Sequence, residues 1–340
     1  MRHAKTCGVV VALSLAGCAS GYRMAPYERA ALPGCEIHGP TTRAACEACG
    51  GADAGACMRV SEAYARGEEA RYDEGMAALF AGRACELGDA RGCHLAGVAY
   101  RDGTLRAAAG TGPAGLISRA CEAATSGCAA GDLALCHLEV MCTAERTRTK
   151  PSVQALATLC ERGHGPSCAE ASWCAGEPEV SAKLARRGCE ARDSESCNVY
   201  ASDQLVGYGV PVDEAAGKAL FERVCSGTGN VFACAGAQGF VSPRVLERAR
   251  LGEPAPSRPQ PDLRTLGSLS PPLAAADRSA ILGFCLDDGG AAGEVKVLQS
   301  WGDPRMDTQL ELTLRGWNYG PQRLPQRCWW ATFRMRLMYK

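Results

Sequence analysis

The feature that most constrains this chain is a pair of cysteines that recurs with seven residues between its members. The pair occurs at Cys49/Cys57, Cys85/Cys93, Cys128/Cys136, Cys160/Cys168 and Cys189/Cys197, and a sixth pair, Cys225/Cys234, is one residue longer. The first members lie 36, 43, 32, 29 and 36 residues apart. A period of this size is typical of stacked two-helix repeats.

The seven-residue interval fits a short turn between two antiparallel helices. Residues on either side of such a turn face each other, and their Cα atoms can approach the roughly 5.5 Å that a disulfide requires. Each bridge closes a small loop, so it contributes about 2–3 kcal/mol in the chain-entropy model. Aromatic residues are only 6% of the chain, while glycine and alanine are abundant. Because small side chains bury little area, we expect the bridges to supply part of the stability.

Helical patterns precede the first cysteines of the pairs. Asp73 and Asp213 each lie twelve residues before the first cysteine of their copy, where a helix N-cap would fall. Apolar stripes with helical spacing follow these two caps, at Met76, Leu79, Phe80 and Ala84 and at Ala216, Leu220 and Val224. Pro151-Ser152 and Pro178 predict the helix starts of two intervening copies.

The segment Gly207–Asp213, of sequence Gly-Tyr-Gly-Val-Pro-Val-Asp, is followed by Ala219-Leu220-Phe221 and a cysteine, and Leu95–Gly103 ends in Tyr-Arg-Asp-Gly. These residues resemble the Sel-like (Sel-one) repeat, a relative of the tetratricopeptide repeat, over roughly residues 46–240, and the cysteine interval is that of the family's secreted cysteine-rich branch. The resemblance implies a mainly α fold, an αα-repeat solenoid with disulfide-stapled helix pairs over residues 35–250, with a concave surface for partners. The copies at 128–175 lack the tyrosine and the Gly-x-Gly-Val turn.

The first residues have the pattern of an exported protein. Met1–Lys5 is short and positive, and Gly8–Leu15 is an apolar run too short to span a bilayer. Leu15-Ala16-Gly17-Cys18 resembles the lipobox of bacterial lipoproteins, which implies a signal peptide over 1–17, acylation of Cys18 and a tether over 18–34. Ala19-Ser20 lacks the aspartate that retains many such proteins in the inner membrane, so we expect an outer-membrane anchor facing the periplasm. The alternative is an ordinary signal peptide cleaved nearby, with Cys18 a plain thiol.

The cysteines outside the six pairs leave several pairings open. Cys46-Glu47-Ala48-Cys49 permits a zinc or a redox interpretation. Because export favours oxidation, we expect instead that Cys35 pairs with Cys46, beside the Cys49/Cys57 bridge. Cys142 and Cys174 each follow the second cysteine of a pair by six residues, which suggests bridges between adjacent repeats. Cys121 has no evident partner.

The pattern changes after the repeats. Residues 251–275 begin with a proline-rich stretch that predicts a semi-rigid linker. Beyond it, Ala280–Asp287 and Glu294–Gln299 read as strands joined by a glycine turn. Gly302-Asp303-Pro304 then starts a helix with a stripe at Met306, Leu310, Leu314 and Trp317. Trp329–Tyr339 alternates between apolar and polar residues as a half-buried strand does.

The order strand–strand–helix–strand, with Gly302–Asp307 and Trp317–Pro321, resembles the C-terminal domain of TonB over residues 276–340. It implies a small α+β (ββαβ) domain in which Cys285 and Cys328 bridge neighbouring strands; an unrelated small α+β domain is the alternative. Members of that family bind extended peptides at a sheet edge, where unpaired backbone groups accept another strand. Energy-transducing members have an inner-membrane helix instead of a lipid anchor, so we expect a binding module without the transducing machinery.

Signatures of catalysis are absent from the sequence. It contains no Gly-x-Ser-x-Gly elbow, no His-Glu-x-x-His helix and no Walker phosphate loop. No lysine follows a serine by three residues, as a serine β-lactamase requires, although cysteine-rich relatives of the repeat family have been described as β-lactam-binding. His94 and His137 each follow the second cysteine of a pair, which permits a metal site but more often reflects packing. Four tyrosines could line a groove or fill interfaces between helices: Tyr64, Tyr72, Tyr100 and Tyr208.

These patterns together predict a membrane-anchored lipoprotein that binds envelope proteins or peptides through its repeats and its C-terminal module. Two binding surfaces tethered to one membrane would raise the effective concentration of a partner. With 37 basic and 37 acidic residues, nothing indicates nucleic acid. We expect no cofactor and no metal, and the balance leans against an enzyme. The alternatives are a β-lactam-binding or weakly hydrolysing protein, and metal storage or redox exchange through free thiols.

Overall fold

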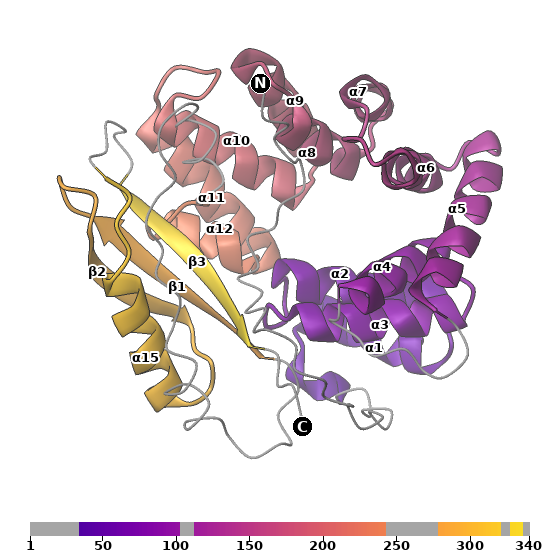
Figure 1. Ribbon diagram of the computed structural model, residues 1–340, viewed down its shortest axis with the longest axis horizontal. Helices are drawn as coiled ribbons and strands as arrows, with labels where there is room; N and C mark the ends of the chain where they lie inside the picture. Colours follow the sequence, from indigo (N-terminus) through magenta and orange to yellow (C-terminus); the bar gives the residue numbers. More distant parts are fainter. Residues whose placement is uncertain (1–33, 103–111, 243–277, 321–326, 336–340) are drawn as a thin grey trace.

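The computed structural model describes residues 34–102, 112–242, 278–320 and 327–335, which form a curved array of helix pairs and a small sheet with one helix (Figure 1). After a 3-10 helix at Cys35–Ile37, the pairs are α1 (Pro40–Gly50) with α2 (Ala54–Arg66), α3 (Glu74–Glu86) with α4 (Ala90–Arg101), α5 (Pro113–Ala129) with α6 (Leu133–Thr147), α7 (Val153–Glu161) with α8 (Gly165–Cys174), α9 (Pro178–Glu190) with α10 (Ser194–Val206), and α11 (Glu214–Thr228) with α12 (Val231–Ala237). None of the described helices is long and apolar enough to cross a membrane.

One disulfide joins the two helices of every pair next to the turn between them. The bridges are Cys49–Cys57, Cys85–Cys93, Cys128–Cys136, Cys160–Cys168, Cys189–Cys197 and Cys225–Cys234, with Cα–Cα distances of 4.3 to 4.7 Å. The copies at 128–175, which depart from the repeat sequence, have the same bridged geometry. The predicted fold class, an αα-repeat array with disulfide-stapled helix pairs followed by a small α+β domain, is confirmed.

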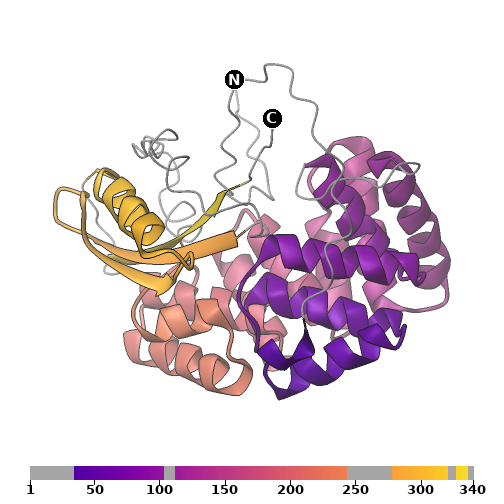
Figure 2. The same ribbon diagram turned by 90° about the horizontal axis from the view of Figure 1, so that it is seen from below.

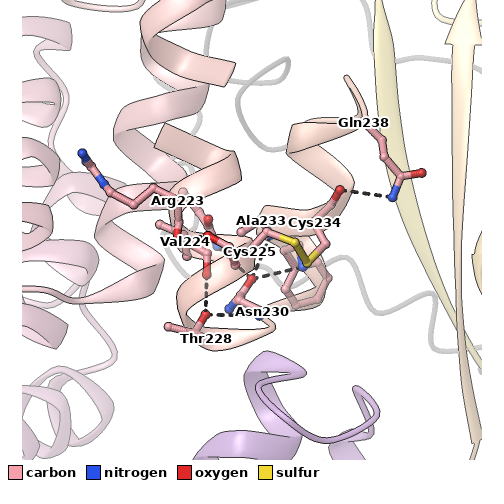
Figure 3. Close-up of a disulfide and its surroundings, with 11 residues drawn as sticks. Arg223, Val224, Cys225, Thr228, Asn230, Ala233, Cys234 and Gln238 are labelled. Carbon is pink, nitrogen blue, oxygen red and sulfur yellow. Dashed lines mark hydrogen bonds between the residues drawn. A yellow bond between two sulfur atoms is a disulfide. The ribbon is translucent and has the colours of Figure 1, made fainter. Parts of the chain in front are cut away.

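The turn inside each pair repeats one backbone pattern. The residue five positions before the second cysteine has a positive φ, between 65° and 97°, at Ala52, Gly88, Gly131, Gly163, Arg192 and Gly229. The next residue is the N-cap of the second helix, and in every pair except α7/α8 its side chain accepts a backbone N–H, at Asp53, Asp89, Asp132, Asp193 and Asn230. Figure 3 shows this at the sixth pair, where Asn230 Oδ1 accepts from the amide of Ala233 at 2.9 Å beside the Cys225–Cys234 bridge. Turn and cap together bring the two cysteines within bonding distance.

The first helices begin where the sequence predicts. The carboxylates of Asp73 and Asp213 accept from the backbone amides three residues later, at 3.0 and 2.9 Å, and so cap α3 and α11. Ser152 caps α7, and Pro178 is the first residue of α9. Each of these residues satisfies or removes an amide that the first helical turn leaves without a partner.

Within the described part of the helix array, two further disulfides join cysteines outside the six pairs. Cys35 bonds to Cys46, so the Cys46–Cys49 motif is divided between two bridges and offers no thiolate pair for zinc or redox chemistry. Cys121 bonds to Cys142 with a Cα–Cα distance of 5.6 Å. The expectation that Cys142 bridges adjacent repeats is therefore wrong. The bond joins α5 to α6 within one pair, about two helical turns from the Cys128–Cys136 bridge of the same pair. Cys174 is also disulfide-bonded.

The array curls back so that its last pair meets its first (Figures 1 and 2). The amide of Val231 donates to the carbonyl of Gly67 at 3.2 Å. The Glu68 carboxylate accepts from the Ser194 hydroxyl and from the Asn230 side-chain amide. We call this junction, residues 66–69 against 193–194 and 230–231, the seam. The sequence predicts a solenoid with a concave surface, and the seam closes this solenoid on itself.

The C-terminal module consists of β1 (Arg278–Leu286), β2 (Ala292–Gln299), α15 (Pro304–Arg315) and β3 (Cys328–Met335). The sheet has the order β2-β1-β3 with both pairs antiparallel, which is the predicted ββαβ arrangement. Apolar residues of α15 and β3 meet over one face of the sheet: Met306, Leu310, Leu314, Trp329, Ala331 and Phe333 are all buried. The helix ends before Trp317, which is nonetheless buried against Phe284. Cys285 and Cys328, directly paired across β1 and β3, form a disulfide.

The other face of the sheet packs on the helix array. The Phe240 ring lies against Gly283 on this face, and a single buried cluster runs from α10, α11 and α12 into the module. The module therefore lies on the array and does not extend from it as a separate surface. The signal peptide at 1–17, Cys18 with nearly all of the tether at 18–34, and the linker at 251–275 lie outside the described residues.

Candidate functional site

Polar contacts join the second helices of successive pairs. They are Glu62–Arg91 at 3.5 Å between α2 and α4, His94–Glu145 at 3.4 Å between α4 and α6, His137–Ser167 at 2.9 Å between α6 and α8, Ser196 to the Gly165 carbonyl at 3.4 Å between α10 and α8, and Asn198–Asn230 at 3.1 Å between α10 and α12. The seam completes the circuit back to α2, where Arg66 also approaches Asp193 at 3.8 Å. We call these side chains the inner polar face.

Three residues of the inner polar face share one position in the repeat. His94, His137 and Asn198 all directly follow the second cysteine of their pair, so the staple orients them toward the next pair. Partly exposed ion pairs of this kind contribute little individually, about 0–1 kcal/mol. Connected polar networks instead fix which helices face each other. The inner polar face therefore helps to hold successive pairs in their observed orientation.

A serine between two histidines is the most unusual cluster on this face. Ser167 Oγ lies 2.9 Å from His137 Nδ1 and 2.7 Å from His164 Nδ1, and the two rings are 5.4 Å apart. Burial, together with the nearby His164 and His94, lowers the pKa of His137 from 6.5 to about 4. Burial also lowers the pKa of His164, against the attraction of Asp193. Both rings are therefore neutral at pH 7, and one donates to the hydroxyl while the other accepts from it.

A serine beside an imidazole is also the arrangement of an activated nucleophile. Ser167 is fully buried, however, so a substrate does not reach its oxygen in this conformation. An imidazole with a pKa of about 4 is also a weak general base at neutral pH. The cluster therefore stabilises the contact between α6 and α8.

His94 and His137, considered above as a metal pair, have separate partners. His94 Nε2 lies 3.4 Å from Glu145 Oε2, while Arg101 lies 3.3 Å from the other carboxylate oxygen. These two neighbours, His94 foremost, lower the pKa of Glu145. Within the described ranges, no three or more histidine, cysteine, aspartate or glutamate side chains are grouped as a metal site requires.

The tyrosines fill interfaces and do not line a groove. Tyr64 is buried, stacks on Phe80 with ring centroids 5.7 Å apart, and bonds through its hydroxyl to His38 at 2.8 Å. Burial raises the pKa of Tyr64 to about 12. Tyr72 and Tyr208 are buried as well, and Tyr100 is half-buried.

A groove of about 460 Å³ lies beside the seam, between α1, α2 and the end of α11. Its charged side chains already have partners. Glu69 accepts from the amides of Thr41 and Thr42 at 2.7 and 3.0 Å and so caps α1. Glu62 pairs with Arg91, and Glu68 belongs to the seam. The groove therefore presents no unsatisfied charge that would select a ligand.

The C-terminal module contacts both ends of the array. From the first end, Arg71 donates to the carbonyls of Ser279 and Ser300 at 2.5 Å each. The backbone N–H of Tyr72 donates to the side-chain oxygen of Gln299, and the side-chain nitrogen of Gln299 donates to the backbone carbonyl of Tyr72, both at 3.0 Å. From the last end, the Phe232 ring lies between Tyr72 at 5.0 Å and Trp330 at 4.6 Å. The module therefore bridges the seam from outside.

The two edges of the sheet differ. The edge of β3 is occupied at its start, where the amide of Val241 donates to the carbonyl of Cys328 at 3.1 Å and the amide of Trp330 donates to the carbonyl of Val241 at 3.0 Å. The edge of β2 is covered only at its start, where Ala292 donates to the carbonyl of Trp317 at 3.1 Å. Farther along, no described residue pairs with the outer backbone of β2 over 295–297. This segment has the unpaired groups that strand addition requires.

No protein-family model matches this chain, and no curated protein matches it. Two solved structures are similar to it. One is c5321, a protective antigen present in uropathogenic Escherichia coli strains displaying an SLR fold, with 15% identity and a TM-score of 0.30 over 58% of this chain and 43% of that one. The other is a Sel1 repeat protein from Oxalobacter formigenes, with 17% identity and a TM-score of 0.32 over 60% of this chain and 80% of that one. This chain spans less than half the length of the first, and the fold assignment rests on the helix pairs described above.

Proposed function

We propose that this protein is a lipid-anchored scaffold of the bacterial cell envelope that binds a protein or peptide partner and does not catalyse a reaction. The observation that carries the proposal is the stapled, closed array that holds a three-stranded sheet with the outer backbone of β2 unpaired over the described residues. A rigid base that presents a strand edge suits the capture of an extended segment. The side chains of the inner polar face, by contrast, make their polar contacts with one another across successive helix pairs.

The bridges support an exported location. Nine disulfides join pairs of described cysteines, and bonds of this number form and persist in oxidising compartments. The resemblance of Leu15–Cys18 to a lipobox supports acylation of Cys18, which would place the protein at the periplasmic face of the outer membrane. Acyl chains contribute roughly 0.8 kcal/mol per buried CH₂, so several chains hold such a protein firmly.

Strand addition gives the proposal a mechanism. Backbone groups of β2 would pair with an extended partner segment, and the membrane anchor would confine the encounter to the envelope. Because the array and the module share one buried cluster, the strand edge is held in a fixed orientation relative to the array. Affinity would then come from backbone bonds, and specificity from the side chains beside them.

A photo-crosslinking amino acid at Val297, on the open part of β2, tests the proposal in the native host. We expect one defined envelope protein to be crosslinked, with the attachment mapped to a short extended segment. The same crosslinker at Lys218, an exposed residue of α11 on the far side of a stapled pair, is the control and should capture nothing specific. A Cys18→Ser variant should leave the membrane fraction and lose the product. Equal capture at Val297 and Lys218 would refute strand addition at this edge.

The alternative function, β-lactam binding or weak hydrolysis, has one feature in its favour, the serine–histidine cluster at Ser167. Nitrocefin turnover by the oxidised protein, abolished by Ser167→Ala but retained by a Ser172→Ala control in the same helix, would support it. Absence of turnover at micromolar protein would favour the scaffold.

A further inference from the structure

The chain just after α12 already pairs with the edge of β3 through an isolated β-bridge. Val241 forms a parallel bridge with Trp329 in β3, through the two backbone hydrogen bonds to Cys328 and Trp330 described above. Val241 is fully buried and belongs to the cluster that joins array and module. The β3 edge therefore already pairs in the parallel sense with one residue from outside the sheet.

The residue before Val241 fills a notch in the sheet. Gly283 lies at the centre of β1, opposite Trp330 in β3 and Lys296 in β2. The Phe240 ring covers it so closely that a Cβ at position 283 would lie 2.5 Å from Phe240 Cδ1. Any residue other than glycine would exclude the ring, so the notch and the edge together recognise an aromatic residue followed by an aliphatic one.

We propose that the β3 edge and the Gly283 notch form a binding site for an extended aromatic–aliphatic peptide, and that Phe240-Val241 is its internal ligand. An external segment of the same chemistry displaces the internal one. The inference rests on the proposed function, since it assumes that the module captures extended segments, and it adds a second site, its ligand class and its built-in competitor.

Few backbone bonds hold Phe240-Val241 on β3, so a longer external strand can displace it. The internal ligand makes two backbone hydrogen bonds to β3 and follows Gly239, whose φ of 92° lets the chain turn away from α12 at a single residue. A longer external strand would continue along β3 past Trp330 and pair with the outer backbone at Thr332, which no described residue contacts through a backbone hydrogen bond. It would thereby add a backbone bond at Thr332 to those that Val241 makes with Cys328 and Trp330. Against this gain, the internal segment competes at the high effective concentration of a tethered ligand.

The test uses the full-length oxidised protein and a fluorescein-labelled peptide with the chain's own sequence from Gly236 to Ser242, Gly-Ala-Gln-Gly-Phe-Val-Ser. Binding is measured by fluorescence anisotropy to the wild type and to a Phe240→Ala/Val241→Ala variant, whose internal ligand is weakened. We expect at least tenfold tighter binding to the variant, and loss of binding when Gly283→Ala is added to it. A peptide with serine at the phenylalanine and valine positions, and a Val212→Ala variant on an exposed loop, are the controls and should change nothing.

Equal affinity of the peptide for the wild type and the double variant would overturn the inference, and so would binding that survives Gly283→Ala. If the double variant does not fold, hydrogen exchange decides on the wild type alone: excess peptide should speed exchange over residues 238–242, and unchanged exchange overturns the inference. The outcome is separable from that of the proposed function. Crosslinking at Val297 without peptide binding here removes only the second site, and peptide binding here without an envelope partner removes only the scaffold role.

Discussion

Acidification should destabilise this protein through His137 before its carboxylates titrate. The pKa of His137 is lowered from 6.5 to about 4 in the folded protein, chiefly because burial disfavours the charged ring. Between those two values the unfolded chain binds a proton that the folded chain does not, so stability falls as the pH falls through this window. Above pH 6.5 the contribution is fully present, and below about pH 4 no further loss occurs.

The expected magnitude follows from the size of the shift. One pKa unit corresponds to about 1.4 kcal/mol, and most of the window lies between pH 7 and pH 5, so His137 should lower the free energy of unfolding by about 2 kcal/mol over that range. His164 adds to the loss, since burial lowers its pKa as well. The neighbouring His164 and His94 contribute to the same lowering of the pKa of His137, after burial.

Urea unfolding at pH 7 and pH 5, with disulfides intact, measures the effect. His137→Gln replaces the ring with an amide that can still bond to Ser167 but does not titrate, and this variant should lose about 2 kcal/mol less than the wild type between the two pH values. His38→Gln, at a histidine outside the inner polar face, is the control and should follow the wild type. If the wild type and His137→Gln lose the same stability, the pKa of His137 is not lowered by burial and the reasoning fails.

Three further predictions concern the turns, the staples and the seam. Ala52→Gly should stabilise the protein by about 0.5–1 kcal/mol, and Gly88→Ala should destabilise it by about 1 kcal/mol, because both positions have a positive φ. Since Gly88 has open space around it, the loss there would come from the backbone alone. Changes of opposite sign in the free energy of unfolding would confirm the turn pattern. Removing the Cys85–Cys93 bridge by Cys85→Ser/Cys93→Ser should cost about 2–3 kcal/mol in the same assay, and no loss would contradict the staple argument. Glu68→Ala should cost about 1–2 kcal/mol and speed amide exchange at Val231, whereas Glu86→Ala, at an exposed residue of α3, should leave that amide unchanged.

The sequence was sufficient for the helix pairs because local chemistry determines them. Each turn combines a residue that tolerates a positive φ, an N-cap and a cysteine four residues later, and these act within about ten residues. The Cys121–Cys142 bond obeys the same logic and could have been found. Cys121 lies seven residues before Cys128, and Cys142 lies six residues after Cys136. Both are therefore about two helical turns from the loop, on antiparallel helices that face each other.

The closure of the array could not be predicted in this way, because it depends on how each pair is rotated against the next. Glycines control that rotation by letting backbones approach. A Cβ at Gly217 in α11 would lie 2.8 Å from the carbonyl oxygen of Ala201 in α10, and a Cβ at Gly97 in α4 would lie 2.6 Å from the Ile117 side chain of α5. These contacts join residues that are 16 and 20 positions apart in the sequence, which is farther than the range over which a turn or a cap acts. A small change at each step accumulates over six pairs into the difference between an open and a closed array.

Two segments of the array each supply residues to both the seam and the C-terminal module. The loop after α2 supplies Glu68 to the seam and Arg71 and Tyr72 to the module, so one short segment holds both contacts. The last helix likewise supplies Asn230 to the seam and Phe232 to the module. A partner that displaces Phe240-Val241 from β3 would therefore act nine to eleven residues along the chain from Asn230 and Val231, which close the array. If a peptide displaces Phe240-Val241, we therefore expect hydrogen exchange at the Val231 amide of the seam to speed up, and unchanged exchange there would refute a link through α12.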